Sequence, residues 1–310
     1  MNIRPLDLLD LPTLYRYRGE ALSLDTARLL TRGNPLGAIG LMAYLNPDRH
    51  IYSAVASDDG VKLLGGISQS NGESFAKLLY LAPTAHLTHT ALPALIEHLT
   101  TEAGAWGSFH VLAEVEETSQ AFAALRLAGF SVYAWQRVWD LSAVEGQDMA
   151  DHWHKVSGAN LPAVQLLHHQ IVPPLLQAIE PAPRRTGGWI CPEGGRCYVG
   201  VASGVYGVLL TPLIHPEASD VAQKFVSLLK HLPERRNRPV YVCVRSYQAW
   251  LEPVLEDLGA KASPRQAVMV KHLTRVIKEE EALTRAAQPA TAIPASRVSH
   301  IETKEPGATP

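Results

Sequence analysis

The sequence predicts an α/β fold in which one unit, a mixed and mostly antiparallel central sheet flanked by helices, is duplicated in tandem. Three observations predict it. Short strand-like runs are separated by hairpin turn signals, amphipathic helices follow them, and the same order of elements occurs in both halves. A chain of 310 residues suits two domains, because a domain commonly holds roughly 100–150 residues.

The first half begins with a short strand and helical segments and continues as an antiparallel meander. The short strand is expected at 3–6, and the helical segments at 7–18, 26–30 and 36–45. Three strands follow at 51–57, 61–69 and 73–81, separated by the hairpin signals "DDG" and "SNG". A helix then carries Leu92, Leu95, Ile96 and Leu99 at i, i+3, i+4 and i+7. The rest reads as strand, helix and strand, at 109–115, 118–130 and 131–141.

The second half repeats this order. Strands are expected at 187–191, 197–204 and 205–214, followed by helix 215–232, strand 239–245, helix 248–260 and strand 266–273. Pro83 aligns with Pro216 at an offset of 133 residues, and Gln136 aligns with Gln266 at an offset of 130. We interpret this as an internal duplication, the alternative being a chance likeness between two α/β units.

The duplication sets the expected domain boundaries. An N-terminal domain spans 1–141, a polar linker 142–154, and a C-terminal domain 155–278. The segment 279–310 loses its large apolar residues and gains Ala, Pro and Thr, so we expect a disordered tail.

Composition excludes several classes of function. A formal net charge of -2 argues against sequence-independent binding of nucleic acid and against binding to an anionic membrane. Three cysteines fit neither a disulfide framework nor a four-ligand zinc site, and no apolar run is long enough for a signal peptide or a membrane span. We therefore expect a soluble, cytoplasmic protein; the sequence does not indicate its oligomeric state.

The order of elements, together with "IRPLDLLDLPTL" at the start and "ALRLAGFSVYAWQRVWDL" at the end of the first half, resembles the GNAT superfamily of acyl-CoA N-acyltransferases. The second half is similar to it through "IHPEASDVAQKFVSLL" and "VLEDLGAKASPRQAVMVKHL". The resemblance covers roughly residues 1–141 and 155–275. It implies a tandem of two degenerate GNAT-like domains, with acetyl-CoA or another acyl-CoA as co-substrate and an amine of a small molecule or protein as acceptor.

In that family a glycine-containing turn after the fourth strand holds the cofactor's pyrophosphate at a helix N-terminus. The corresponding stretch here runs from His86 to Ala91 and contains no glycine. The resemblance makes the cofactor-binding candidates Leu81, His86, Leu87, Thr88, His89 and Thr90. In the second half Ser219 and Asp220 occupy the same place. The alternative is that Thr88 or Thr90, and Ser219 or Asp220, only cap the helices that follow.

The family's catalytic positions are also altered. Leu125 and Leu255 replace the tyrosine that often serves as general acid, and Thr118 and Gln248 replace an asparagine near the start of the same helix. Glu73 and Glu114 are the candidates for a general base in the first half.

No metal site is expected. The histidine groups 152–154 and 168–169 lack further ligands at suitable spacing, and we interpret them as exposed histidines of a connecting segment.

Two functional hypotheses follow. The first is a GNAT-like N-acetyltransferase or other acyltransferase, in which at most the N-terminal domain moves an acyl group from acyl-CoA to an amine. The second is a non-catalytic pseudoenzyme that acts as a binding or protein-interaction module. The cleft beside residues 81–91 distinguishes them, because an enzyme needs it open.

Overall fold

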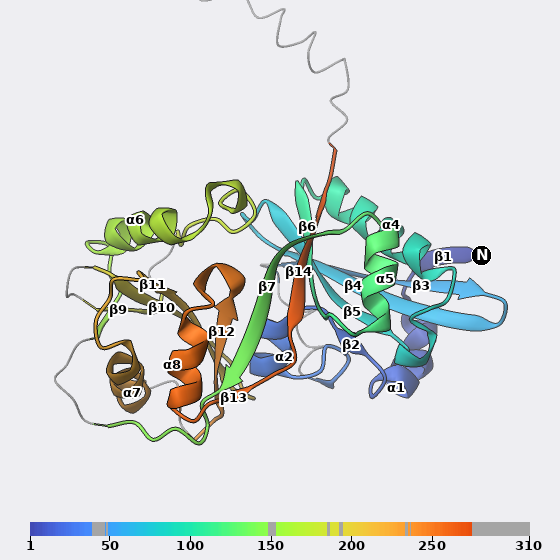
Figure 1. Cartoon of the computed structure of the whole chain (residues 1–310). Helices are drawn as coiled ribbons and strands as arrows, with labels where there is room; N and C mark the ends of the chain where they lie inside the picture. The colour runs from blue at the N-terminus through green and yellow to red at the C-terminus, as the bar shows by residue number, and fades with distance from the viewer. Residues whose placement is uncertain are drawn as a thin grey trace, which may run out of the picture. The chain divides into compact units, whose positions relative to one another are not determined.

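One mixed sheet of 14 strands runs through the part of the chain that the computed structural model describes (Figure 1). Described are residues 1–38, 47, 49–147, 153–184, 187–191, 195–232, 235 and 237–274. The predicted tail at 279–310 and most of the predicted helix at 36–45 lie outside these residues.

The first half contains an antiparallel meander followed by a helix, as predicted. Its strands are β1 (Asn2–Pro5), β2 (Leu22–Ser23), β3 (Arg49–Asp58), β4 (Val61–Ser70), β5 (Phe75–Ala82), β6 (His110–Glu116) and β7 (Ser131–Asp140). Its helices are η1 (Leu8–Asp10), α1 (Leu11–Tyr17), α2 (Thr26–Arg32), η3 (Thr84–His86), α4 (Leu92–Ala105) and α5 (Gln120–Leu127). The sequence did not predict the two-residue strand β2.

The second half follows the same plan. Its strands are β8 (His154–Lys155), β9 (Trp189–Cys191), β10 (Cys197–Ser203), β11 (Val208–Ile214), β12 (Val240–Arg245), β13 (Lys261–Ala262) and β14 (Gln266–His272). Its helices are α6 (Leu161–Ile171), η4 (Pro174–Leu176), α7 (Val221–His231), η5 (Ser246–Gln248) and α8 (Leu251–Asp257). None of the described helices has the length and apolarity that crossing a membrane requires.

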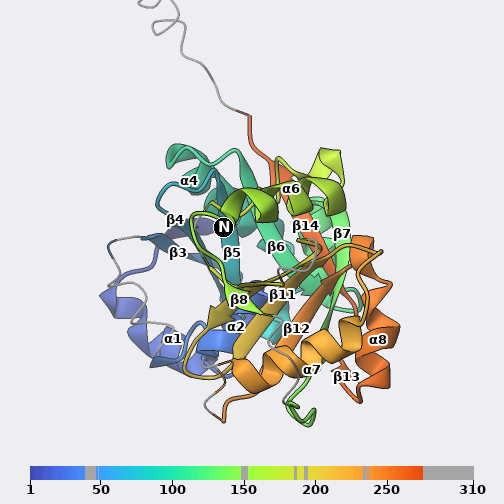
Figure 2. The same cartoon turned by 90° about the vertical axis from the view of Figure 1, so that its left-hand side faces the viewer.

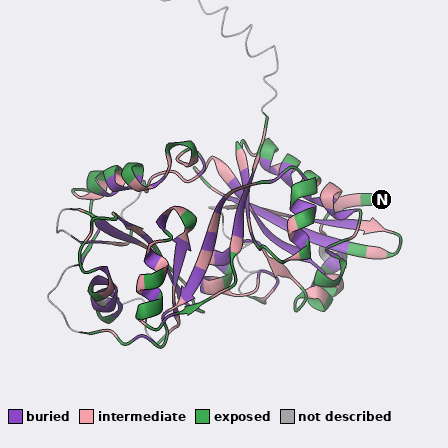
Figure 3. Ribbon diagram, viewed as in Figure 1, coloured by how far each residue is buried: buried purple, intermediate pink, exposed green. Residues whose placement is uncertain are grey.

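Helices cover both faces of the sheet. In the second half, α7 and α8 pack on one face through Phe225, Leu228 and Leu255, and α6 packs on the other through Val164 and Leu167 (Figure 2). The strands between them are buried over most of their length (Figure 3). This explains their nearly continuous apolar sequences.

The last strand of each half lies in the other half's part of the sheet. The strand order is β1-β3-β4-β5-β6-β14-β7-β12-β11-β10-β9-β8, so β14 pairs with β6 and β7 pairs with β12 (Figure 1). The two exchanged strands also pair with each other, antiparallel. The halves are therefore joined by backbone hydrogen bonds, and residues Met1–Thr274 form one unit. The domain boundaries drawn from the sequence stay predictions.

The pairing of β7 with β14 has the symmetry that a duplication requires. Gln136 and Gln266, which the sequence alignment matches at an offset of 130, lie directly opposite each other in the ladder. The Gln136 Nε2 atom donates to Gln266 Oε1 over 2.7 Å. Two equivalent residues that face each other across an antiparallel pair mark a local two-fold axis.

The end of the β6–β14 ladder predicts an acid-sensitive stability. The Nδ1 atoms of His110 and His272 are 3.0 Å apart, and burial, together with the His272 imidazole, lowers the pKa of His110. The unfolded chain therefore binds more protons there, so stability is full above the unfolded pKa of about 6.5 and falls as the pH decreases through the lowered folded-state value. We expect the melting temperature of the wild type to fall more than that of His272→Asn between about pH 8 and about pH 5.5.

The control is His154→Asn, which changes an exposed histidine of β8 and should leave the acid-side loss at its wild-type size. Equal losses in the wild type and in His272→Asn would contradict the prediction.

Candidate functional site

The first half has a notch where strands β5 and β6 diverge. These parallel strands pair only from Phe75 opposite His110 to Lys77 opposite Leu112. Beyond that point the edge of β5 towards the turn 83–91 is separated from β6. An extended ligand could bind to such an edge as an added strand.

The chain itself occupies this notch. Strand β2 pairs with β5, with Leu22 opposite Leu81. The Leu24 N–H donates to the Leu79 carbonyl over 2.9 Å, and the Glu114 N–H donates to the Leu24 carbonyl over 2.9 Å. Leu24 thus bridges the two diverging strands, and its side chain is 1% exposed. The cofactor-binding candidate Leu81 is thus already paired within the chain, opposite Leu22 of β2.

The notch of the second half is closed by a side chain. Strands β11 and β12 are parallel and pair only as far as Leu210 opposite Val242. Past this point the Gln248 carboxamide accepts from the Ile214 N–H over 2.9 Å and donates to the Pro212 carbonyl over 2.8 Å. Gln248 is 1% exposed, and its carboxamide acts as one peptide unit of an added strand.

The two closures act on equivalent backbone groups. At the offset of 133, Leu79 corresponds to Pro212 and Leu81 to Ile214. The Leu79 carbonyl accepts from the Leu24 N–H, and the corresponding Pro212 carbonyl accepts from the Gln248 carboxamide. Acyl-CoA therefore does not fit the edge of β5 or of β11 in this structure, because each edge is already hydrogen-bonded within the protein.

The turn before α4 also satisfies its own backbone. The N–H groups of His86, His89 and Leu92 donate to carbonyls three residues earlier. The predicted threonine cap is absent: Ala91 precedes the helix without a side-chain cap, and its N–H donates to His89 Nδ1 over 3.2 Å.

Of the other cofactor candidates in this turn, Leu87 is buried, while His86, Thr88 and Thr90 are exposed. The predicted capping interaction is also absent in the second half. Asp220 has a φ of 53° and makes no side-chain hydrogen bond to the start of α7.

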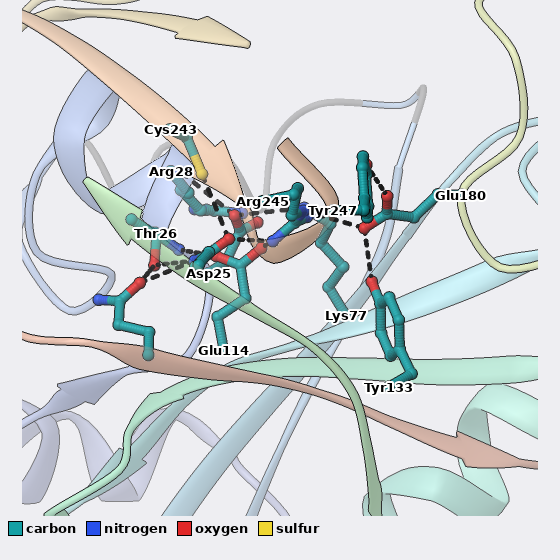
Figure 4. A network of polar contacts seen from close by, with 12 residues as sticks. Asp25, Thr26, Arg28, Lys77, Glu114, Tyr133, Glu180, Cys243, Arg245 and Tyr247 are labelled. Atoms are coloured by element: carbon teal, nitrogen blue, oxygen red, sulfur yellow. Dashed lines mark hydrogen bonds and ion pairs between the residues drawn. The ribbon is translucent and has the colours of Figure 1, made fainter. Parts of the chain in front are cut away.

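A buried polar network lies where the halves meet, around Arg245 at the end of β12 (Figure 4). Its Nε atom is 3.0 Å from Glu180 Oε1, and its Nη2 atom is 3.7 Å from Glu114 Oε1. Its Nη1 atom donates to the Gln136 carboxamide. One guanidinium therefore joins the end of β12 to residues of β6 and β7 and to Glu180.

Two tyrosines complete the shell of Glu180. Tyr133 donates to Glu180 Oε1 over 2.9 Å and Tyr247 donates to Glu180 Oε2 over 2.7 Å (Figure 4). Burial, reinforced by the Glu180 carboxylate, raises the pKa of both phenols. Burial alone lowers the pKa of Arg245, but Glu180 and the other acidic groups around it hold that pKa well above its usual value. The tyrosines stay protonated and Arg245 stays charged.

Glu114, a candidate general base, belongs to this network. Its Oε2 atom accepts from the Thr26 N–H over 2.9 Å. Burial raises the pKa of Glu114. The positive charges of Lys77 and Arg245 and the hydrogen bonds from Thr26 lower this pKa by more than burial raises it, so the net shift is downward. A carboxylate with a lowered pKa and occupied oxygens is a weak proton acceptor. This geometry favours a structural role.

Glu73, the other candidate, lies in the turn between β4 and β5. Its backbone N–H donates to Ser70, and its carbonyl accepts from the Gln69 carboxamide over 2.7 Å. Its side chain lines a cavity of about 380 Å³ together with Lys77 and residues of α2.

The other polar side chains around Gln136 are uncharged. Thr26 Oγ1 donates to Gln266 Oε1 over 3.0 Å, and Cys243 Sγ lies 3.3 Å from Gln136 Oε1. Burial raises the pKa of the Cys243 thiol to about 12, so it is not a nucleophilic thiolate.

The described residues contain no group of three or more His, Cys, Asp or Glu side chains that could hold a metal ion. The interpretation of His168 as an exposed residue of a connecting segment is wrong, because it lies in α6 and is 3% exposed.

Sequence reasoning missed Arg245, Glu180 and both tyrosines. A signal existed: Arg245 ends an otherwise apolar strand, and Lys77 interrupts another. Charged residues in buried strands must find partners. The sequence does not show that Glu180, far from both along the chain, is one of them.

The described residues have a tandem GNAT fold. Two solved structures share it. One is a tandem GNAT protein from the clavulanic acid biosynthesis pathway, with a TM-score of 0.50 and 14% identity over 89% of this chain and 99% of that chain. The other is a GCN5-related N-acetyltransferase from Sphaerobacter thermophilus, with a TM-score of 0.53 and 11% identity over 89% of this chain and 96% of that chain. No protein-family model and no curated protein matches the sequence.

The central guanidinium leads to a stability prediction. Arg245→Met leaves the largely buried Glu180 carboxylate without its counter-ion and removes one of the two cations beside Glu114, so we expect a loss of about 3–5 kcal/mol in the free energy of unfolding. Chemical denaturation measures it. The control Arg196→Met removes an exposed pair with Glu217 and should cost about 0–1 kcal/mol. A similar small loss for both variants would show that Arg245 does not hold the network together.

The closure of the second notch by Gln248 leads to a second stability prediction. Gln248→Ala leaves the buried Ile214 N–H and Pro212 carbonyl without their partner, which should cost about 1–3 kcal/mol. Gln223→Ala, at an exposed position of α7, should change stability by no more than about 0.5 kcal/mol. If denaturation midpoints of the two variants coincide, the carboxamide does not close the edge.

Proposed function

We propose that this protein is a non-catalytic GNAT-fold binding module, which binds a small-molecule or protein partner and does not use acyl-CoA. One observation carries the proposal: in both halves, equivalent backbone groups at the notch are hydrogen-bonded within the chain, by Leu24 and by Gln248. The loss of glycines from the turn 86–91 and the leucines at 125 and 255 point the same way.

The free-energy cost of opening the notch supports this proposal for the first half. Freeing the β5 edge breaks the bonds of Leu24 to Leu79 and to Glu114 and unpairs Leu22 from Leu81. At about 1 kcal/mol net for each of some three or four hydrogen bonds, and about 2 kcal/mol for exposing Leu24, the cost is roughly 5 kcal/mol. An acyl-CoA that must displace this segment loses roughly three to four orders of magnitude in apparent affinity.

The second candidate function is acyl transfer from acyl-CoA to an amine by the first half. The tandem fold shared with a GCN5-related N-acetyltransferase favours it, as does the cavity beside Glu73. It requires the segment 22–24 to leave the notch when the cofactor binds.

Calorimetric titration of the full chain with acetyl-CoA and longer acyl-CoAs separates the two candidates. We expect no saturable binding up to about 1 mM, the upper end of the usual range for enzyme substrates. Hydrogen exchange of the Leu24 and Glu114 amides, measured with and without acetyl-CoA, should not change. Micromolar binding with faster exchange at Leu24 would overturn the proposal in favour of acyl transfer. Weakened binding in His86→Ala/His89→Ala would then place the cofactor on the turn.

A further inference from the structure

The cavity beside α2 contains more positive than negative charge. It has a volume of about 380 Å³ and lies between α2, the facing ends of β4 and β5, the start of β3 and the end of β10. Its charged lining consists of Asp25, Arg28, Arg32, Arg49, Glu73 and Lys77. Four cationic and two anionic side chains therefore surround one concave space.

Only part of this charge is balanced within the cavity. Lys77 Nζ lies 3.4 Å from Asp25 Oδ1, and the Asp25 carboxylate raises the pKa of Lys77, so this pair is a fixed ion pair. Glu73 is then the remaining carboxylate of the lining, and it shares the cavity with the guanidinium groups of Arg32 and Arg49.

Two of these guanidinium groups are available to a ligand. Arg32 ends α2 and Arg49 begins β3, and both side chains are partly buried. Neither guanidinium group makes a hydrogen bond or an ion pair with any of the residues that the structure describes. Like charges held in one concave, partly desolvated space repel each other, and a bound anion relieves that cost.

We propose that this cavity binds a small organic anion, whose carboxylate or phosphoryl group lies against Arg32 and Arg49. Guanidinium groups match the planar or trigonal arrangement of oxygens in both anions and donate two hydrogen bonds to each. Glu73 accepts a hydrogen bond from a hydroxyl or amine of the same ligand. Ser70 and Ser203 add hydroxyl groups to the wall.

This inference goes beyond the proposed function, because the cavity and the closed edges of β5 and β11 are different parts of the molecule. Binding of acyl-CoA with faster hydrogen exchange at Leu24 would overturn the proposed function and leave the anion site standing. Failure of the anion site would leave the closed edges unaffected.

The test titrates the full chain with inorganic phosphate, with succinate and with AMP, at an ionic strength held constant with chloride, and follows calorimetric heat and melting temperature. We expect at least one of these anions to bind saturably and to raise the melting temperature above the chloride control. Phosphate or AMP alone assigns a phosphoryl ligand, and succinate alone assigns a carboxylate. No saturable binding by any of the three overturns the proposal.

Variants locate the site. Arg32→Gln/Arg49→Gln should lower the affinity for the anion at least roughly tenfold, because the charge-assisted hydrogen bonds of both guanidinium groups are removed. Arg16→Gln/Arg126→Gln, which removes two exposed arginines of α1 and α5, should leave affinity unchanged. Ser203→Glu places a carboxylate at an exposed position of the cavity wall and should weaken binding even if the double variant folds poorly. Wild-type affinity in Ser203→Glu or in a folded double variant would contradict the assignment.

Discussion

The antiparallel pairing of β7 with β14 is the constraint on which the rest of the structure depends. Each strand ends one half of the duplication and pairs with the other half, so neither half has a complete sheet without its counterpart. A central pairing of this kind places the equivalent residues Gln136 and Gln266 face to face. It also brings Arg245 of β12 within reach of Glu114 of β6, which lie on opposite sides of the exchanged pair.

This placement explains why so many charged and polar groups are buried at one point. A carboxylate or guanidinium in a sheet interior is costly unless it is paired and hydrogen-bonded. Here Arg245 has two carboxylates and a carboxamide around it, and two phenols donate to Glu180. These buried ionisable groups therefore stabilise one another. Their shifted pKa values follow from burial and mutual attraction, with the tyrosines protonated and Glu114 ionised.

The sequence predicts the strands, the helices and the duplication, because apolar periodicity and turn residues are local signals. The sequence also shows directly that the turn 86–91 lacks the glycines that hold a pyrophosphate in the GNAT proteins it resembles. What closes the notches is not local. The sequence around Leu22 and Leu24 does not differ from that of a loop, and Gln248 stands at a position where the resemblance to GNAT proteins leads us to expect an asparagine. Only the tertiary structure shows that the segment 22–24 pairs with the edge of β5 and that Gln248 pairs with the edge of β11. Side-chain capping by threonine was expected and is replaced by His89.

The closed notches also stabilise the sheet from within the chain. An unpaired strand edge next to a divergence exposes backbone donors and acceptors that need partners. A ligand supplies them only while it is bound, whereas β2 and the Gln248 carboxamide supply them permanently. The backbone groups that could bind an extended ligand at these edges are hydrogen-bonded within the chain and contribute to folding. A ligand that pairs with either edge must therefore replace hydrogen bonds that stabilise the sheet, and the charged cavity beside α2 lies apart from both edges.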